Sequence, residues 1–99
     1  MYKEIFSYEL AEGVTEEKFL QVANRIHEVW MSKQSGFVGW EINKEENGTY
    51  TDIVYWKSKD DAKNSETTMK DIPNVQEWFS CYNAPPISSK KLEELAHFP

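Results

Sequence analysis

One stretch near the middle of the chain limits the fold more than any other: Asp52-Ile53-Val54-Tyr55-Trp56-Lys57-Ser58-Lys59-Asp60-Asp61-Ala62. Its first half ends in two large aromatic residues and is typical of a strand. Ser58 and Asp61 then have the spacing of a reciprocal helix N-cap, with Asp where Glu is usual. The stretch predicts a strand that runs directly into a capped helix, and therefore a small α+β sandwich with a cleft.

Periodicity predicts the first half of the fold. Residues 2–11 alternate with a period of two and form a strand with Phe6 and Tyr8 on its face that is richer in rings. Thr15 then caps a helix whose first turn is acidic, as the helix dipole favours. Apolar residues recur at helical spacing and predict the buried stripe of this helix. The stripe consists of Phe19, Ala23, Ile26 and Trp30.

The second half is less regular. Residues 37–43 and 49–56 are predicted strands, joined across Asn47-Gly48, which is a strong hairpin signal. A polar helix over residues 59–70 stops before Pro73, and residues 75–82 form a short helix or turn. We expect Pro85-Pro86 to break the chain before a final segment.

The final segment, residues 88–98, is compatible with two structures. Lys-Lys-Leu-Glu-Glu-Leu-Ala favours a helix by propensity, but Leu92, Ala96 and Phe98 also fit one face of a strand. The preceding order β-α-β-β-α lacks one strand of a ferredoxin-like β-α-β-β-α-β sandwich. On that ground we predict a strand, and a single domain over residues 1–99.

The hairpin also predicts which side chains share a face. A two-residue turn pairs Trp40 with Tyr55 and Gly39 with Trp56. One face then carries Val38, Trp40, Ile42, Ile53 and Tyr55, and the other carries Gly39, Glu41, Asp52, Val54 and Trp56. Because the helices cover only one face, we expect the other to pack on the sheet of a second copy, as a homodimer. A longer turn would shift the register by one residue and exchange the faces.

Composition excludes several classes of partner and site. The net charge is −6, and no Lys/Arg cluster could follow a phosphate backbone, so we expect no nucleic acid. No apolar run approaches the roughly 20 residues that span a bilayer. The single cysteine, Cys81, allows no intrachain disulfide and lacks an obvious partner base. No cluster has the spacing of metal ligands, and we expect a soluble cytoplasmic protein without a metal.

Three features together resemble the dimeric α/β-barrel superfamily: Val-Tyr-Trp before Lys-Ser-Lys, Gly-Phe-Val-Gly-Trp after a long first helix, and the element order. Within it the chain is most similar to the antibiotic-biosynthesis-monooxygenase-like domains, over about residues 3–83. The resemblance implies a ligand cleft between the sheet and the helices of each protomer, and sheets that meet across a dimer. Members include cofactor-independent oxygenases of aromatic polyketides and haem-degrading monooxygenases.

The resemblance does not extend to haem degradation. Trp56 matches a cleft tryptophan of those enzymes and of several oxygenases. However, the iron-binding histidine that they need in the following helix is missing from residues 59–70, and no amide stands near Phe6 or Ser7. His27 and His97 do not match that place. We therefore expect no haem and no other cofactor.

The resemblance leaves cofactor-independent oxygenation of an aromatic or polyketide-like molecule as the implied activity. Such chemistry removes a proton from a phenolic substrate, whose carbanion then reacts with oxygen. We expect Trp56 and Phe6 to stack the ring, and Tyr8, Tyr82 or His27 to transfer the proton. Further candidates for the binding wall are Gly39, Val54 and Trp30.

Each candidate also has a purely structural interpretation. His27 flanks the apolar stripe and fits a surface histidine, and Glu41 with Asp52 fits solvated strand-end carboxylates as well as a paired acid and base. Gly39 opposite Trp56 leaves room for a ligand, unless the indole itself fills it. The alternative function is a non-catalytic dimeric module that holds a small apolar ligand or packs shut. The lack of an obvious acid–base pair favours the module, and the resemblance favours the enzyme.

Overall fold

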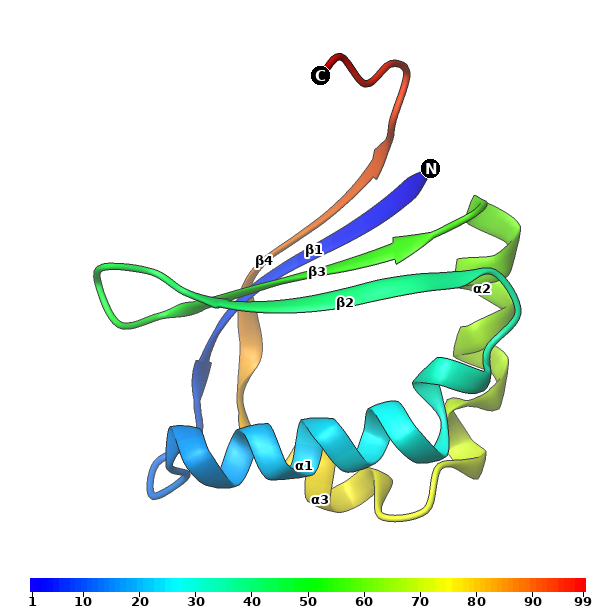
Figure 1. The fold of residues 1–99 in the computed structure, drawn as a ribbon. Coiled ribbons are helices and arrows are strands. Elements are labelled where there is room, and N and C mark those ends of the chain that lie inside the picture. The colour runs from blue at the N-terminus through cyan, green and yellow to red at the C-terminus, as the bar shows by residue number, and fades with distance from the viewer.

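The computed structural model describes residues 1–99 and confirms the ferredoxin-like β-α-β-β-α-β sandwich of the α+β class. One antiparallel sheet has the strand order β2-β3-β1-β4, and the helices lie on one side of it (Figure 1). The strands are β1 (Tyr2–Leu10), β2 (Phe37–Lys44), β3 (Tyr50–Trp56) and β4 (Tyr82–Glu93). The helices are α1 (Glu16–Val29), α2 (Lys59–Thr68) and α3 (Val75–Phe79), with single 3-10 turns at Met31–Lys33 and Met69–Asp71.

Side-chain caps decide where the two longer helices begin, as predicted. Thr15 Oγ1 accepts a hydrogen bond from the Lys18 N–H at 3.1 Å, and Ser58 Oγ accepts one from the Asp61 N–H at 3.1 Å. The Ser58 hydroxyl also contacts the Asp61 carboxylate at 2.9 Å. A cap of this kind stabilises a helix by about 1 kcal/mol. Because Trp56 ends β3 only two residues before Ser58, the cap holds this indole at the junction of strand and helix.

The predicted pairing of the β2–β3 hairpin is wrong by one residue. The Glu45 N–H donates to Thr49 O at 2.8 Å, and the Gly48 N–H donates to Glu45 O at 2.9 Å, so the loop has three residues instead of two. Gly48 has a φ of +89°, as the last position of such a loop requires. Trp40 therefore pairs with Val54.

This shift exchanges the two faces of β2. Trp40 and Ile42 turn toward the helices and pack against the core, beside the inward residues of β3. The outer face keeps Ile53 and Tyr55, both half-buried, next to the exposed Glu41. The outer face is consequently less apolar than the two-residue turn had implied.

The final segment is a strand, as predicted, but it begins and ends earlier than the expected range of residues 88–98. β4 starts at Tyr82, and only residues 94–99 lie beyond it and extend away from the body (Figure 1). β4 continues through Pro85-Pro86, where we expected a break, but its pairing with β1 is interrupted there: Ser7 pairs with Ser88, and Glu9 pairs with Asn83. Proline is tolerated at edges and irregular pairings since it has no N–H to donate.

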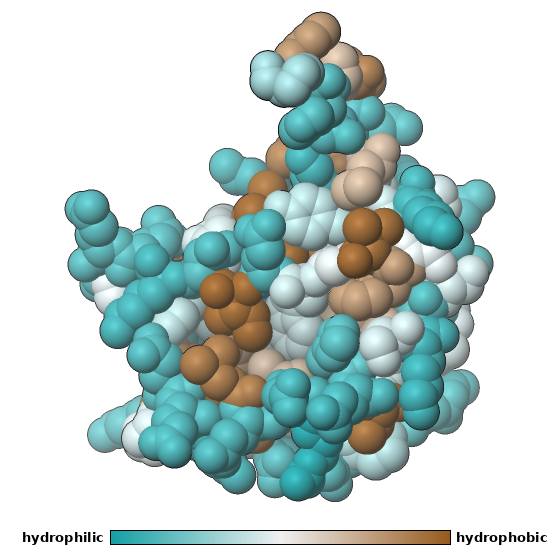
Figure 2. Space-filling model, viewed as in Figure 1, coloured by the Kyte–Doolittle hydropathy of each residue, from teal (hydrophilic) through white to brown (hydrophobic).

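The core lies between the inner face of the sheet and the helices. On the face seen in Figure 2, apolar and near-neutral residues gather near the middle, and hydrophilic residues surround them. No helix has the length and apolar character needed to cross a membrane. The buried core residues are Tyr2, Tyr8, Phe19, Val22, Ile26, Trp30, Met31, Tyr50, Val54, Trp56, Ala62, Ile72, Trp78 and Cys81.

Candidate active site

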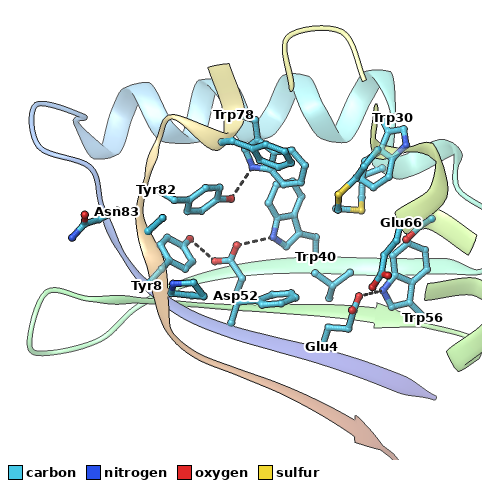
Figure 3. A pocket seen from close by; sticks show the side chains of 18 residues that line it. Glu4, Tyr8, Trp30, Trp40, Asp52, Trp56, Glu66, Trp78, Tyr82 and Asn83 are labelled. Atoms are coloured by element: carbon cyan, nitrogen blue, oxygen red, sulfur yellow. Dashed lines mark hydrogen bonds between the residues drawn. The ribbon is translucent and has the colours of Figure 1, made fainter. Parts of the chain in front are cut away.

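A cavity of about 640 Å³ lies between the inner face of the sheet and the helices (Figure 3). Its volume falls within the roughly 300–1,000 Å³ of typical small-molecule sites. Eighteen residues line it, and twelve of them are hydrophobic. The aromatic lining comprises all four tryptophans (Trp30, Trp40, Trp56 and Trp78) together with Phe6, Tyr8, Phe79 and Tyr82.

The four indole N–H groups all donate to acceptors within the protein. The pairs are Trp30 with Thr68 Oγ1 (2.8 Å), Trp40 with Asp52 Oδ2 (3.0 Å), Trp56 with Glu4 Oε1 (2.8 Å) and Trp78 with the Tyr82 hydroxyl (2.7 Å). These bonds fix the orientation of each ring. The indole N–H groups are therefore already used within the protein and are not free to bind a ligand.

Asp52, on β3, is the most unusual group in the cavity. Only 4% of its surface is exposed, and no ion pair neutralises it. The Tyr8 hydroxyl donates to its Oδ1 at 2.6 Å, and Trp40 Nε1 donates to its Oδ2 at 3.0 Å. Burial raises the pKa of Asp52 to about 6, although both hydrogen bonds act to lower it. Such a carboxylate is mostly ionised at pH 7 and is better suited to accept a proton than an ordinary aspartate.

Glu4, on the neighbouring strand β1, is a second buried carboxylate in the same cavity. It is 8% exposed and accepts a hydrogen bond from Trp56 Nε1 at 2.8 Å. Burial raises the pKa of Glu4, and the charge of Glu66 acts in the same direction, while the bond from Trp56 and the charge of Lys91 oppose the rise. Two central strands thus each contribute one carboxylate to an aromatic cavity.

Two phenols stand beside Asp52. The Tyr82 hydroxyl accepts from Trp78 and keeps its own proton for a ligand, and its ring lies edge-on to that of Tyr8, with centroids 4.9 Å apart. Burial raises the pKa of both phenols, and the charge of Asp52 raises it further. Both hydroxyl groups therefore stay protonated at neutral pH and act as donors.

The structure brings six of the predicted site residues together around this cavity. They are Phe6, Tyr8, Trp30, Val54, Trp56 and Tyr82. They come from β1, β3, β4 and the end of α1, which are distant in sequence. Their convergence places the aromatic wall and the phenols in one site.

Gly39 and His27 do not belong to this group. Gly39 pairs with Tyr55, and a Cβ at Gly39 would meet the Tyr55 side chain at 3.8 Å, so the space beside Trp56 does not arise from this glycine. His27 is exposed on α1, with its ring centroid 5.8 Å from that of Phe37. Both residues line a separate, shallower hollow and lie outside the lining of this cavity.

Glu41 and Asp52 were compatible with a paired acid and base or with two solvated carboxylates. The structure shows an exposed Glu41 and an Asp52 that is buried in the cavity, so they are not a pair and Asp52 is not solvated. Glu41 lies on the outer face, where it accepts a hydrogen bond from the Tyr55 hydroxyl at 2.8 Å. Sequence reasoning missed Glu4, Trp40 and Trp78 as site residues. Of these, only Glu4 could have been predicted from the sequence, because Glu4, Phe6 and Tyr8 occupy alternate positions of β1 and therefore share one face. The two-residue turn places Trp40 on the face opposite Trp56, whereas the observed register places both on the inner face.

No family model matches the sequence, and no curated protein matches it. Solved structures match it over nearly their full length. The cofactor-independent oxygenase SnoaB of Streptomyces nogalater aligns with a TM-score of 0.78 and 14% identity, covering 99% of this chain and 96% of that one. A candidate antibiotic biosynthesis monooxygenase from Bordetella bronchiseptica aligns with a TM-score of 0.69 and 20% identity (96% and 97% covered). Another candidate antibiotic biosynthesis monooxygenase, from Chloroflexus aurantiacus, aligns with a TM-score of 0.70 and 12% identity, covering 99% of this chain and 96% of that one.

At these identities the likeness concerns the fold. The chain shares the fold of SnoaB and of structures described as antibiotic biosynthesis monooxygenases, which is the fold that the sequence resemblance predicted. Because one fold can support many functions, the residues of the cavity determine what the protein does.

Proposed function

We propose that this protein is a cofactor-independent oxygenase of an electron-rich phenolic molecule of aromatic or polyketide type. The observation that carries the proposal is Asp52, a buried carboxylate with a pKa of about 6 in a cavity walled by aromatic rings. The shared fold with SnoaB, itself described as a cofactor-independent oxygenase, adds support by analogy.

Asp52 acts as the general base in this proposal. It accepts a proton from an acidic CH₂ group of the substrate, and the carbanion gives one electron to O₂, so that the resulting radical pair combines to a peroxide. Protonation of the peroxide and loss of water leave a carbonyl group. Overall, CH₂ and O₂ become C=O and H₂O, and the substrate itself supplies the electrons.

Other groups of the cavity bind and stabilise the reacting molecule. The free proton of the Tyr82 hydroxyl is donated to the substrate oxygen on which negative charge develops. Trp40, Trp56 and Trp78 stack against the substrate rings and exclude water from the carbanion.

We also infer that the protein is a homodimer formed through the outer face of the sheet. Ile5, Ile53 and Tyr55 stay half-exposed on the central strands, and Leu92 on β4 is 45% exposed. A partly apolar sheet face of this kind favours cover by another protein surface, and the same face of a second copy is the simplest cover.

One observation favours a second candidate function, a non-catalytic module that holds a small apolar ligand. Every buried side-chain nitrogen and oxygen already has a hydrogen-bond partner within the protein. The polar groups of the cavity therefore have structural roles that need no catalysis to explain them. The two functions differ in whether oxygen is consumed.

A two-stage experiment separates them. A thermal-shift screen with phenols and quinones identifies a binder, since a ligand at about 100 times its Kd adds about 2.7 kcal/mol of stability. Oxygen uptake is then measured with that binder for the wild type and for Trp56→Ala. Uptake by the wild type that falls in the variant supports the oxygenase. Binding without uptake supports the module, and equal uptake by both proteins removes Trp56 from the mechanism.

A further inference from the structure

The cavity carries negative charge that no basic residue in its lining balances. Its acidic members are Glu4, Asp52 and Glu66, and none of the eighteen lining residues is lysine, arginine or histidine. Lys91 lies outside the lining and pairs with Glu66 at 3.9 Å, with both side chains about half exposed. The whole chain has a net charge of −6. A cation that enters the cavity therefore meets an attractive potential.

The cavity also offers few donors to an anion. All four indole N–H groups are used within the protein, and the Ser65 hydroxyl donates to Ala62 O at 2.6 Å. The Asn83 amide donates to Glu9 Oε2 at 3.5 Å. A free donor remains at the Tyr82 hydroxyl, which lies toward Asp52 and away from Glu4 (Figure 3). The end of the cavity at Glu4 presents acceptors and ring surfaces.

Aromatic surface and carboxylates coincide at that end. Trp30, Trp56, Glu4 and Glu66 gather there (Figure 3). The indole N–H groups of Trp30 and Trp56 are bound to protein acceptors. The two rings line the cavity, with 6% and 1% of their surfaces exposed. Tryptophan is the aromatic side chain that attracts organic cations most strongly.

We propose that the Glu4 end of the cavity binds an organic ammonium group, so that the substrate is an aromatic molecule with an alkylammonium substituent. The ammonium group pairs with Glu4 at the end of the cavity that Trp30 and Trp56 line, while the aromatic ring extends toward Asp52. The part of this proposal that concerns the ring rests on the proposed function, and the binding of the cation does not.

The titration of Glu4 supports the proposal. The groups that act on it are Trp56 from β3, Glu66 from α2 and Lys91 from β4, and its pKa is raised, chiefly because of burial. A bound cation stabilises the ionised carboxylate. The affinity for an ammonium ligand should therefore rise with pH as Glu4 ionises, whereas the affinity for an uncharged ligand should not.

Binding of three small probes tests the proposal directly. Benzyltrimethylammonium is compared with its uncharged isostere neopentylbenzene and with the phenylacetate anion, by quenching of tryptophan fluorescence. We expect the cation to bind at least about tenfold more tightly than the isostere, and phenylacetate to bind more weakly than both. Glu4→Gln should lose about tenfold in affinity for the cation only. The exposed-carboxylate control Asp71→Asn should lose nothing.

Two results would overturn the proposal. Equal affinity for the cation and its isostere would remove the role of charge. Loss of cation binding in Asp52→Asn but not in Glu4→Gln would place the ammonium group at the other end. Circular dichroism checks that each variant is folded, and Glu4→Asp, which keeps the charge, is expected to retain the preference if Glu4→Gln does not fold. Because no probe is turned over, the result is independent of whether the protein consumes oxygen.

Discussion

The Tyr8 hydroxyl lies 2.6 Å from Asp52 Oδ1, although the two residues are 44 positions apart. Pairing of β1 with β3 sets Tyr8 opposite Tyr50 and Phe6 opposite Asp52, so Tyr8 and Asp52 are diagonal neighbours on the inner face. The bond holds the carboxylate in position and limits the rise of its pKa. The basicity of the proposed catalytic group therefore depends on how the two central strands pair.

Tyr8→Phe keeps the ring and removes the strongest donor to Asp52. Because this bond lowers the pKa of Asp52 from the level that burial alone would produce, we expect the pKa in the variant to rise above about 6. Carbon-detected NMR titration of the Asp52 carboxyl group measures it. Tyr50→Phe is the matched control, since the Tyr50 hydroxyl donates to Glu16 instead. An unchanged or lowered pKa in Tyr8→Phe would contradict this assignment.

Asp52→Asn should change how stability depends on pH. The pKa of Asp52 is about 6 in the folded protein, against an ordinary value of 3.8. The raised value stabilises the folded wild type fully below pH 4, and this stabilisation is lost as the pH rises through 6. The difference in the free energy of unfolding between the variant and the wild type should therefore shift by up to about 3 kcal/mol in favour of the variant as the pH rises from 3 to 8. Urea unfolding at each pH measures this shift, and a pH-independent cost of the substitution does not affect it. A difference that stays constant with pH would argue against the raised pKa.

Trp56→Phe leaves Glu4 buried without its indole donor. We expect a loss of about 1–3 kcal/mol in the free energy of unfolding, because the carboxylate stays desolvated. The double variant Trp56→Phe/Glu4→Gln should lose less than the sum of the single losses. A double-mutant cycle by chemical denaturation measures the coupling, and strict additivity would show that the bond has no energetic role.

Gly36→Ala and Gly39→Ala form a matched pair. Gly36 has a φ of +75°, and a Cβ there would collide with the Asp61 side chain, so we expect a cost above about 1 kcal/mol. At Gly39 the new Cβ would meet Tyr55 at an ordinary 3.8 Å, and the change should be within about 0.5 kcal/mol. Thermal unfolding compares the two variants. Equal losses would contradict the described positions of β2 and of the α2 N-cap.

The oligomeric state tests the outer face of the sheet. Light scattering should give about twice the 11.6 kDa of the chain at micromolar concentration. Ile53→Glu should reduce the mass to that of one chain, because it places a charge in the middle of the proposed interface. Leu20→Glu, on the exposed surface of α1, is the control and should leave the mass unchanged. A wild-type particle of 11.6 kDa would refute the dimer.

Much of the fold could be predicted because its signals are local. The caps at Thr15 and Ser58 and the apolar periodicities each lie within a few residues of one another. The register could not be predicted in this way, since Asn47-Gly48 suits loops of two and of three residues. The choice depends on the packing of Trp40 and Ile42 against the helices, which are remote in sequence.

The site was predictable only in its aromatic part. Strand alternation placed Phe6, Tyr8 and Trp56 on faces that meet at the cavity. The partners of Asp52 come from β1 and β2, and the pKa of this carboxylate depends on a degree of burial that only the assembled sheet creates. No sequence pattern could therefore single out Asp52 over Glu41.

Oxygen consumption with 1,8-dihydroxyanthrone is the most direct test of the proposed base. This probe supplies the aromatic part of the substrate, and the carbanion of its CH₂ group is delocalised over the rings and the carbonyl. After subtraction of the spontaneous reaction, the wild type should consume one O₂ per quinone formed, and Asp71→Asn should match it. Asp52→Asn should be slower by at least about 100-fold. Equal rates for Asp52→Asn and the wild type, or no rate above the spontaneous reaction, would contradict the account.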